Sequence, residues 1–285
     1  MLKHEKSDSL MQLIRELTGN SGCKIHLFLK NEVFFVRKTS KDISYNERLV
    51  NQFHKQVSFN NLKVKTPVIL EAGYSDGLFY MDMEYTAGLP LNDFVTQNHP
   101  RMCSKIISLI LQRNQSCKFN PNTKKLKNKI KTIASQLVAE RSFSTNLVKE
   151  CHKKLTQLHD KNWANLDLSF CHGDLTFENV IIRDNEVYLI DFLDSFVDNH
   201  LLDASKLIMD LIIGWSWRYS DNIPYVKNSL ILSNIYKLYP DKDVDLIHKF
   251  IFLHLLRMYP YTSCPISKNK IELGLSYCLD NFNFK

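Results

Sequence analysis

The sequence predicts an α+β protein with two parts: a small, sheet-rich N-terminal part over residues 1–88 and a larger, mostly helical part over residues 89–285. Short runs rich in β-branched and aromatic residues, separated by turn residues, fill much of the first part. From Leu91 onward the apolar residues instead recur at helical spacing. Gly88 and Pro90 stand between the two patterns, and because both suit a change of chain direction they mark the predicted boundary.

The first element expected is a short helix over residues 9–17. Its apolar side chains have helical spacing, and Ser9 and Gln12 are placed as a capping box. Gly19 and Gly22 then predict a tight turn. A plain β-turn explains these two glycines as well as a functional loop does.

Four strands and one helix follow in the N-terminal part. Lys24–Leu29 and Val33–Lys38 flank a short polar turn and predict one pair of strands. Pro67–Glu71 and Leu78–Tyr85 predict a second pair. Residues 43–57 place apolar side chains on one face of a helix. The N-terminal part is therefore expected to be mainly β-structure.

The remainder of the chain is predicted to be helical. Apolar stripes indicate helices between Leu91 and about Asp160. Further helices are expected after residue 200, over residues 203–218, 223–239, 242–258 and 266–282. These stripes are most simply the core of the helical part.

Composition and cysteine usage exclude several classes of protein. With 44% hydrophobic and 24% charged residues, the chain resembles an ordinary soluble globular protein. Its seven cysteines include no C-x-x-C pair, so zinc and thioredoxin-like sites have no support in the sequence. Scattered cysteines are typical of a reducing compartment, so a cytoplasmic location is expected. The N-terminus is too polar for a signal peptide, and no segment reaches membrane-spanning length.

Charge and short motifs narrow the function further. The net charge is +7, with a denser group of lysines between residues 124 and 131. This group is most simply a solvated helix face, so no nucleic-acid partner is expected, while a positive total suits a protein that binds a nucleoside triphosphate. The chain contains no G-x-x-x-x-G-K-[ST] run, which excludes a P-loop enzyme. No G-x-G-x-x-G follows a strand, which argues against a Rossmann dinucleotide site.

Residues 170–194 carry the most informative pattern of the chain. Two short apolar runs, residues 180–182 and 187–190, flank the turn residues 184–186, whose sequence is Asp-Asn-Glu. The runs are β-branched or aromatic, so the segment predicts a β-hairpin.

Three polar residues stand around this hairpin: Asp174, Asn179 and Asp191. The hairpin would bring Asn179, at the start of one strand, beside Asp191, at the end of the other. A carboxylate and an amide oxygen side by side suit a hard cation such as Mg²⁺. Asp174 lies on the preceding loop and is free to face a substrate hydroxyl. A plain hairpin with polar ends is the competing interpretation.

The order of these residues resembles a known catalytic pattern. His172-x-Asp174-x-x-x-x-Asn179, followed by Asp191 after a strand, matches the catalytic loop and the metal-binding Asp of kinases. Gly173 stands where a protein kinase usually has Arg, which makes the chain similar to the aminoglycoside phosphotransferase and choline kinase branch of that superfamily. The resemblance implies a bilobal protein-kinase-like fold. It also implies transfer of a phosphoryl group from ATP or GTP, with Mg²⁺, to a hydroxyl of a small molecule.

The resemblance implies roles for the residues of the motif. Asp174 is expected to orient the acceptor hydroxyl and take its proton, with His172 supporting the loop. Asn179 and Asp191 are expected to hold Mg²⁺. Asp203 is expected to cap the helix that begins there and to brace the catalytic loop.

The same resemblance implies a nucleotide-binding set in the N-terminal part. Lys38 is expected to reach the non-transferred phosphates; Arg37, on the other face of the strand, is the second candidate, and an exposed strand-end lysine is the plain alternative. Glu47 is expected to pair with Lys38, although Ser44 and Glu47 also form a capping-box pattern that explains this Glu by local structure.

Two further main-chain segments are implied to bind the nucleotide. The turn at Gly19 and Gly22 is expected to cover the phosphates with backbone N–H groups. The segment at Glu84 and Tyr85 is expected to hold the base through main-chain groups. Neither segment identifies the base as adenine or guanine.

The acceptor is expected to contact Asp194, Trp215 and Arg218, which follow the hairpin in sequence. Carboxylates near aromatic faces suit either a sugar or a cationic amine, and Arg218 favours a sugar-like or surface-polysaccharide-related acceptor. A choline, amino-alcohol or aminoglycoside kinase is the alternative. A nucleotide-binding pseudokinase regulator is another, against which the three intact polar residues of the motif argue. The absence of Asp-Phe-Gly and Ala-Pro-Glu argues against a protein kinase.

Overall fold

The chain is described here by a computed structural model. The described residues are 11–17, 19, 22–112, 123–139, 145–158, 163, 166 and 169–284. They form two compact units: Met1–Gly88 with Arg183–Asp194, and Leu89–Ile182 with Ser195–Lys285. The first unit is rich in strands and the second in helices, so the predicted α+β class is confirmed.

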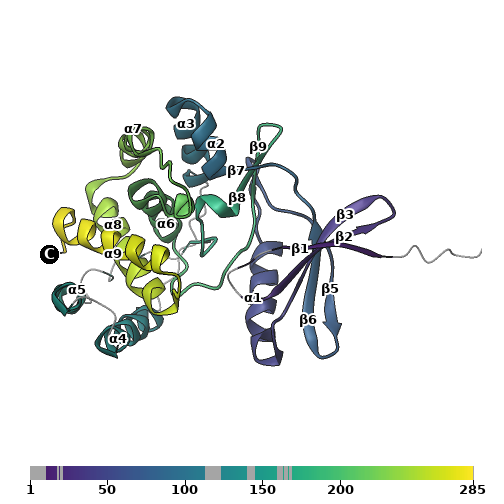
Figure 1. Cartoon of the computed structure of the whole chain (residues 1–285), viewed down its shortest axis with the longest axis horizontal. Coiled ribbons are helices and arrows are strands. Elements are labelled where there is room, and N and C mark those ends of the chain that lie inside the picture. The colour runs from purple at the N-terminus through teal and green to yellow at the C-terminus, as the bar shows by residue number, and fades with distance from the viewer. Residues whose placement is uncertain are drawn as a thin grey trace, which may run out of the picture. The chain divides into compact units, whose positions relative to one another are not determined.

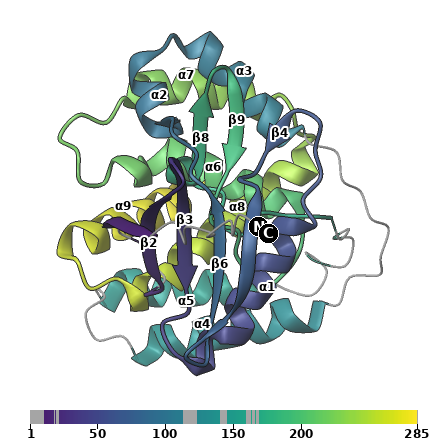
Figure 2. The same ribbon diagram turned by 90° about the vertical axis from the view of Figure 1, so that its right-hand side faces the viewer.

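The first unit is built on a five-stranded antiparallel sheet. Its order is β1-β2-β3-β6-β5, and Figure 2 shows β2, β3 and β6 side by side. The strands are β1 (Gln12–Leu17), β2 (Lys24–Lys30), β3 (Val33–Thr39), β5 (Ile69–Ser75) and β6 (Leu78–Glu84). Both predicted strand pairs therefore form, but the strand predicted over Pro67–Glu71 lies instead over Ile69–Ser75. Left-handed backbone at Asn31 and Glu32 and at Asp76 and Gly77 makes the tight turns within each pair.

The predicted helix over residues 9–17 is wrong within the described residues. Gln12–Leu17 is the edge strand β1, which pairs with β2 from Gln12 opposite Leu29 to Leu17 opposite Ile25. A segment this short cannot sustain a helix without packing, whereas an antiparallel partner supplies hydrogen bonds along its length. Leu13 is 53% exposed, so the apolar spacing does not mark a buried helix face. Ser9, half of the expected capping box, lies outside the described residues.

Helix α1 (Asn46–Val57) packs against β6 of the sheet. A 3₁₀ turn, Ile43–Tyr45, precedes it and is capped by Asp42, whose carboxylate accepts the Tyr45 N–H at 2.9 Å. The N-cap of α1 itself is Tyr45, which makes no side-chain cap, so the capping box of Ser44 and Glu47, the alternative explanation of this Glu, does not form. The core between helix and sheet consists of Cys23, Tyr45, Leu49, Phe79, Met81 and Met83.

The segment Arg183–Asp194 completes the first unit although Leu89–Ile182, which belongs to the second unit, precedes it in sequence. Its strand β9 (Glu186–Leu189) pairs in parallel with β4 (Val64–Lys65), and the Lys65 ammonium is ion-paired with the Glu186 carboxylate. Asp184 and Asn185, just before β9, both have left-handed backbone, as in a two-residue hairpin turn.

The second unit contains the predicted helices. They are α2 (Leu91–Gln97), α3 (Pro100–Leu111), α4 (Thr123–Ala139), α5 (Thr145–Gln157), α6 (His200–Ile213), α7 (Tyr225–Tyr236), α8 (Asp241–Met258) and α9 (Pro265–Asn281). Figure 1 shows α8 and α9 side by side, and α6 contacts both. The short strand β7 (Leu89–Pro90) pairs antiparallel with β8 (Val180–Arg183) through residues 181 and 182.

Helix α6 is the central helix of the second unit. Nearly all of its residues are buried, as is typical of a helix packed on every side. It ends at Gly214, whose φ of 64° is left-handed and whose added Cβ would lie 2.6 Å from Ile223 Cγ2. The predicted helix over residues 203–218 is thus displaced: it begins at His200, and Trp215–Trp217 form a separate 3₁₀ turn.

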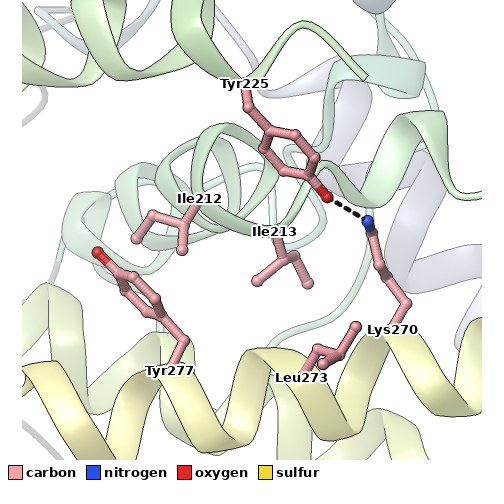
Figure 3. A pocket seen from close by; sticks show the side chains of 6 residues that line it. All are labelled: Ile212, Ile213, Tyr225, Lys270, Leu273 and Tyr277. Atoms are coloured by element: carbon pink, nitrogen blue, oxygen red, sulfur yellow. Dashed lines mark hydrogen bonds between the residues drawn. The ribbon is translucent and has the colours of Figure 1, made fainter. Parts of the chain in front are cut away.

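The C-terminal end of α6, the start of α7 and the middle of α9 line a small pocket, shown in Figure 3. Its lining residues are Ile212, Ile213, Tyr225, Lys270, Leu273 and Tyr277. The Lys270 ammonium donates to the Tyr225 hydroxyl at 2.7 Å, so the charged group that lines this pocket has a partner in the pocket wall. Among the described helices, none has both the length and the apolar composition needed to cross a bilayer.

Acid should destabilise the second unit through His248 on α8. Its ring stacks on Phe282 with centroids 3.8 Å apart, its Nε2 lies 2.9 Å from the Tyr236 hydroxyl, and burial lowers its pKa from 6.5 to about 4. Because the unfolded chain takes up this proton first, stability is complete above pH 6.5 and falls as the pH drops towards 4. We expect a loss of about 2 kcal/mol, allowing for partial exposure. Urea unfolding of wild type and His248→Gln at pH 7.5 and 4.5 checks this; an equal loss in both proteins would contradict it.

Candidate active site

The motif residues of the second unit lie on one loop that leads into β8. His172 and Leu175 are fully buried, and the loop ends in a 3₁₀ turn, Phe177–Asn179. Gly173 has a φ of 92°, a conformation that a side chain disfavours. The glycine in His-Gly-Asp is therefore required by the backbone that presents Asp174.

Asp203 of α6 holds the start of this loop. It is 1% exposed, and its two carboxylate oxygens accept the N–H of His172 at 2.6 Å and the N–H of Gly173 at 2.9 Å. Charge-assisted hydrogen bonds of this kind are strong. The expected capping role is wrong, because the N-cap of α6 is Asn199, which accepts the Leu201 N–H.

Asp210, two turns further along α6, holds the end of the loop. Its carboxylate accepts the Phe177 N–H at 2.8 Å, and it also accepts the N–H and hydroxyl of Ser216 at 2.6 and 2.9 Å. Burial raises the pKa of Asp210 to about 6, against the lowering effect of these donors. The sequence analysis did not single out this residue.

Asp174 lies between these two anchors and its side chain is 25% exposed. The ammonium of Lys206, also on α6, lies 2.9 Å from its Oδ1. Burial alone would raise the pKa of Asp174, but the charge and hydrogen bond of Lys206 outweigh it, and Arg257 and His172 add smaller effects, so the pKa lies below its usual value. Asp174 is thus an ionised carboxylate at neutral pH, able to accept a hydrogen bond from a hydroxyl.

His172 and Asn179 support the loop around Asp174. The Asp174 N–H donates to His172 Nδ1 at 3.3 Å, so His172 contacts the backbone of the loop as a support would. Asn179 Nδ2 donates to the Asp174 carbonyl oxygen at 2.7 Å. With the amide nitrogen fixed in this way, the Asn179 amide oxygen is left to bind a ligand, and an oxygen donor suits Mg²⁺.

In the first unit, Lys38 and Asp191 lie together. Lys38 on β3 is 4% exposed, and its ammonium is ion-paired with Asp191 and donates to Gln52 Oε1 at 3.0 Å. Asp191 has a left-handed backbone, with a φ of 59°, which is uncommon for a residue other than glycine. The buried Lys38 ammonium thus faces one carboxylate and one amide oxygen.

Arg37, the second candidate for the phosphate-binding cation, is bound to another side chain of the sheet. Its guanidinium binds Asp82 on β6 through two hydrogen bonds of 2.7 Å and lies over the ring of Tyr80. Arg37 therefore belongs to the opposite face of the sheet from Lys38.

Residues 27–223 match the model of the phosphotransferase enzyme family, which covers more than half of the chain. The chain belongs to this family. The resemblance in the catalytic loop is thereby confirmed, and the protein is a phosphotransferase. No curated protein sequence matches the chain.

Solved structures show that the phosphotransferase has the protein-kinase-like fold of its relatives. It is similar to a thermostable mutant of aminoglycoside phosphotransferase APH(4)-Ia, with a TM-score of 0.64 at 14% identity, over 95% of this chain and 94% of that chain. Aminoglycoside-3'-phosphotransferase of type VIII gives 0.56 at 16% identity, over 86% and 93%. A putative fructosamine-3-kinase from Haemophilus somnus 129PT gives 0.54 at 14% identity, over 94% and 92%.

The helical partner of Lys38 in this phosphotransferase differs from the one expected. Glu47 is exposed in the first turn of α1, and the residue of this helix that contacts Lys38 is Gln52. Five residues turn the helix by about 140°, so Glu47 and Gln52 cannot face the same side chain. The expected pair of Glu47 and Lys38 is therefore corrected to Gln52 and Lys38, which places a neutral side chain against the lysine.

In one of the two main-chain segments expected to bind nucleotide, backbone N–H groups already donate to carbonyls of the first unit. The Glu84 N–H donates to the Val68 carbonyl at 2.9 Å and the Tyr85 N–H to the Phe34 carbonyl at 3.4 Å. Gly22 has a φ of 75°, whereas an added Cβ at Gly19 would lie 2.6 Å from Ile25 Cδ1. Within the glycine turn, residues 18, 20 and 21 lie outside the described residues.

The residues expected to contact the acceptor are distributed over both units. Asp194 belongs to the first unit and is exposed. In the second unit the Arg218 guanidinium binds Glu178 at 2.9 and 3.0 Å, donates to the Trp215 carbonyl at 3.0 Å, and lies over the Trp215 ring. Arg218 and Trp215 thus form one packed group in which the charge of the arginine is compensated.

Three contacts of the phosphotransferase were not found from the sequence: those of Gln52, Lys206 and Asp210. A signal for the last two exists. Asp203, Lys206 and Asp210 recur three and four residues apart within an otherwise apolar helix, which places three polar groups on one buried face. Gln52 carries no such signal, because an uncharged residue on an amphipathic helix is ordinary.

Proposed function

We propose that the protein transfers the γ-phosphoryl group of ATP or GTP to a hydroxyl group of a small molecule, with Mg²⁺ bound. The observation that carries this proposal is the catalytic loop, in which the Asp174 carboxylate is held ionised and partly exposed between two buried anchors of α6. Membership of the phosphotransferase family supports it. Solved complexes of APH(4)-Ia with ADP or AMP-PNP and hygromycin B concern that protein, and they make a nucleotide and a small acceptor the natural first probes here.

The residues of this chain have distinct roles in the proposed reaction. Asp174 orients the acceptor hydroxyl and receives its proton, while the hydroxyl oxygen bonds to the γ-phosphorus. The bond from that phosphorus to the β–γ bridging oxygen breaks, and the nucleoside diphosphate leaves with the electron pair. Lys38 binds the phosphates that are not transferred, and Asn179 and Asp191 would hold Mg²⁺ through their side-chain oxygens. The metal would offset the negative charge of the phosphates.

A sugar-like acceptor is the preferred version of this proposal. Carboxylates of the second unit near the catalytic loop have partners within the protein: Asp174 has Lys206, Glu178 has Arg218, and Asp198 accepts the Ser195 hydroxyl at 2.7 Å. A polycationic acceptor needs free carboxylates, whereas a polyol is recognised by hydrogen bonds and ring stacking. A choline-like or aminoglycoside acceptor therefore stays the second candidate.

The direct test is a search for the acceptor with Mg·ATP and Mg·GTP. Nucleoside diphosphate release is measured with neutral sugars, sugar phosphates, amino alcohols, aminoglycosides and peptides, each beside a reaction without acceptor. Turnover of a small hydroxyl compound supports the proposal, and turnover of peptides alone overturns it. Nucleotide binding without any hydrolysis, even with water, would favour a pseudokinase regulator.

Removing the Asp191 carboxylate should abolish the Mg²⁺-dependent part of nucleotide binding. A ligand stabilises the folded state in proportion to the logarithm of its concentration over its Kd, so wild type should show a Tm that rises with Mg·ATP. In Asp191→Ala this rise should disappear, and the comparison uses shifts because the loss of the Lys38 partner changes the starting Tm as well. Glu47→Ala, which removes an exposed carboxylate of the same unit, is the control and should keep the full shift. Equal shifts in all three proteins would exclude Asp191 as a metal ligand.

A further inference from the structure

One face of α6 carries three buried polar side chains that contact the catalytic loop at successive points. Asp203, Lys206 and Asp210 are 1%, 2% and 0% exposed. Asp203 binds backbone N–H groups at the start of the loop and Asp210 binds one at its end. Lys206 lies between them and contacts a side chain instead, the carboxylate of Asp174. Lys206 therefore contacts the side chain of Asp174 directly, whereas Asp203 and Asp210 hold only the backbone of the loop.

The surroundings of Lys206 leave Asp174 as its main partner. An ammonium group has three donors, and besides Asp174 Oδ1 at 2.9 Å it reaches only the Met258 thioether, a weak acceptor 3.8 Å away, among the described residues. His254 is fully buried and Arg257 is cationic, so neither compensates the charge. Asp210 acts on it from further away.

A buried ammonium at this point is not explained by stability. Replacing a buried ion pair by apolar side chains of similar volume is often neutral or stabilising, so a leucine or methionine would serve the core of the second unit at least as well. What an apolar residue would not do is fix the carboxylate. The buried Lys206 side chain binds Oδ1 of Asp174 and so restricts rotation of this carboxylate.

We propose that Lys206 is the positioning residue of Asp174: it binds Oδ1 and thereby leaves Oδ2 directed to the acceptor hydroxyl. This inference rests on the proposed function and adds to it the group that orients the base. It also makes the carboxylate less repulsive to the anionic phosphates, since the pair of Lys206 and Asp174 has no net charge.

The test begins with Lys206→Met, which keeps the length of the side chain and removes its charge. Single-turnover transfer from Mg·ATP, to the acceptor or to water, should slow roughly 100-fold, the usual cost of a misplaced catalytic group, with the KM for ATP unchanged. The matched control is Lys249→Met on α8, which removes another buried ammonium, 4% exposed, and should leave the rate near that of wild type. Circular dichroism and the Tm shift with Mg·ATP verify that each variant is folded.

A double-mutant cycle distinguishes positioning from a structural effect. If Lys206 acts through Asp174, adding Lys206→Met to Asp174→Asn should slow the reaction less than twofold further. A full 100-fold slowing in both backgrounds would overturn the inference, as would a wild-type rate in Lys206→Met alone. Should Lys206→Met fail to fold, Lys206→Gln, which keeps a donor without the charge, takes its place in the same cycle. If Asp174→Asn itself retains the wild-type rate, the proposed function fails and not merely the role of Lys206.

Discussion

Replacing Asp174 by Asn should lower the rate of phosphoryl transfer by about three orders of magnitude, the contribution typical of a general base. The amide is nearly isosteric but cannot take the hydroxyl proton. The KM of the Asp174→Asn enzyme for ATP should change little, because Asp174 is not among the residues assigned to the nucleotide or the metal. Steady-state kinetics with the acceptor, or single-turnover hydrolysis without one, measures this. A kcat within tenfold of wild type would exclude Asp174 as the base.

The same substitution should also cost stability. Asn leaves the Lys206 ammonium buried without a compensating charge. Breaking a buried pair from one side is strongly destabilising, and since Asp174 is partly exposed and Asn can still accept a hydrogen bond, we expect a loss of about 2 kcal/mol. Urea unfolding measures it, and kinetics must be recorded where the variant is fully folded. An unchanged midpoint would contradict the ion pair.

Replacing Asp203 by Ala should damage both the fold and the activity. It leaves the N–H groups of His172 and Gly173 without their carboxylate. Each unsatisfied buried donor costs on the order of 1–3 kcal/mol, so the unfolding free energy should fall by about 3 kcal/mol. The loop that presents Asp174 also loses its first anchor, and transfer should slow roughly 100-fold.

The exposed residue Asp221 supplies the control for this prediction. Asp221→Ala removes a carboxylate of the same unit from the surface and should change the unfolding free energy by less than about 0.5 kcal/mol. Asp203→Asn, which keeps one acceptor oxygen, should fall between wild type and Asp203→Ala in both measurements. An Asp203→Ala protein as stable as Asp221→Ala would show that the loop does not depend on Asp203.

Local sequence patterns predicted the elements that depend on local structure. The strand pair formed by Lys24–Lys30 and Val33–Thr39, the helices after Leu91 and the order of the motif residues all follow from spacing within a few positions of the chain. The six-residue strand β1 did not, because its apolar spacing suits a helix while its hydrogen bonds come from a partner strand. For so short a segment the tertiary partner decides.

In the candidate site, too, contacts between residues far apart in sequence could not be predicted from local patterns. The family motif identified Asp174, but the residue that binds its carboxylate lies 32 positions later on α6, where a lysine in an apolar helix has several explanations. The partner of Lys38 was misplaced by five residues along α1, since Glu47 has the expected charge and Gln52 has the position. Charge can be read from a sequence, whereas the face of a helix that meets a given strand depends on packing.

The membership of Arg183–Asp194 in the first unit has a consequence for how the protein is made. During synthesis, Met1–Gly88 leaves the ribosome while β9, the parallel partner of β4, and the carboxylate of Asp191 are still untranslated. About 100 further residues must be added, which takes on the order of 5 to 20 seconds at ordinary elongation rates. Through this interval the nascent N-terminal segment holds the Lys38 ammonium without its counter-ion. A translated fragment that stops at Gly88 is therefore an incomplete folding unit, and one extended through Asp194 is the shortest that contains the whole first unit.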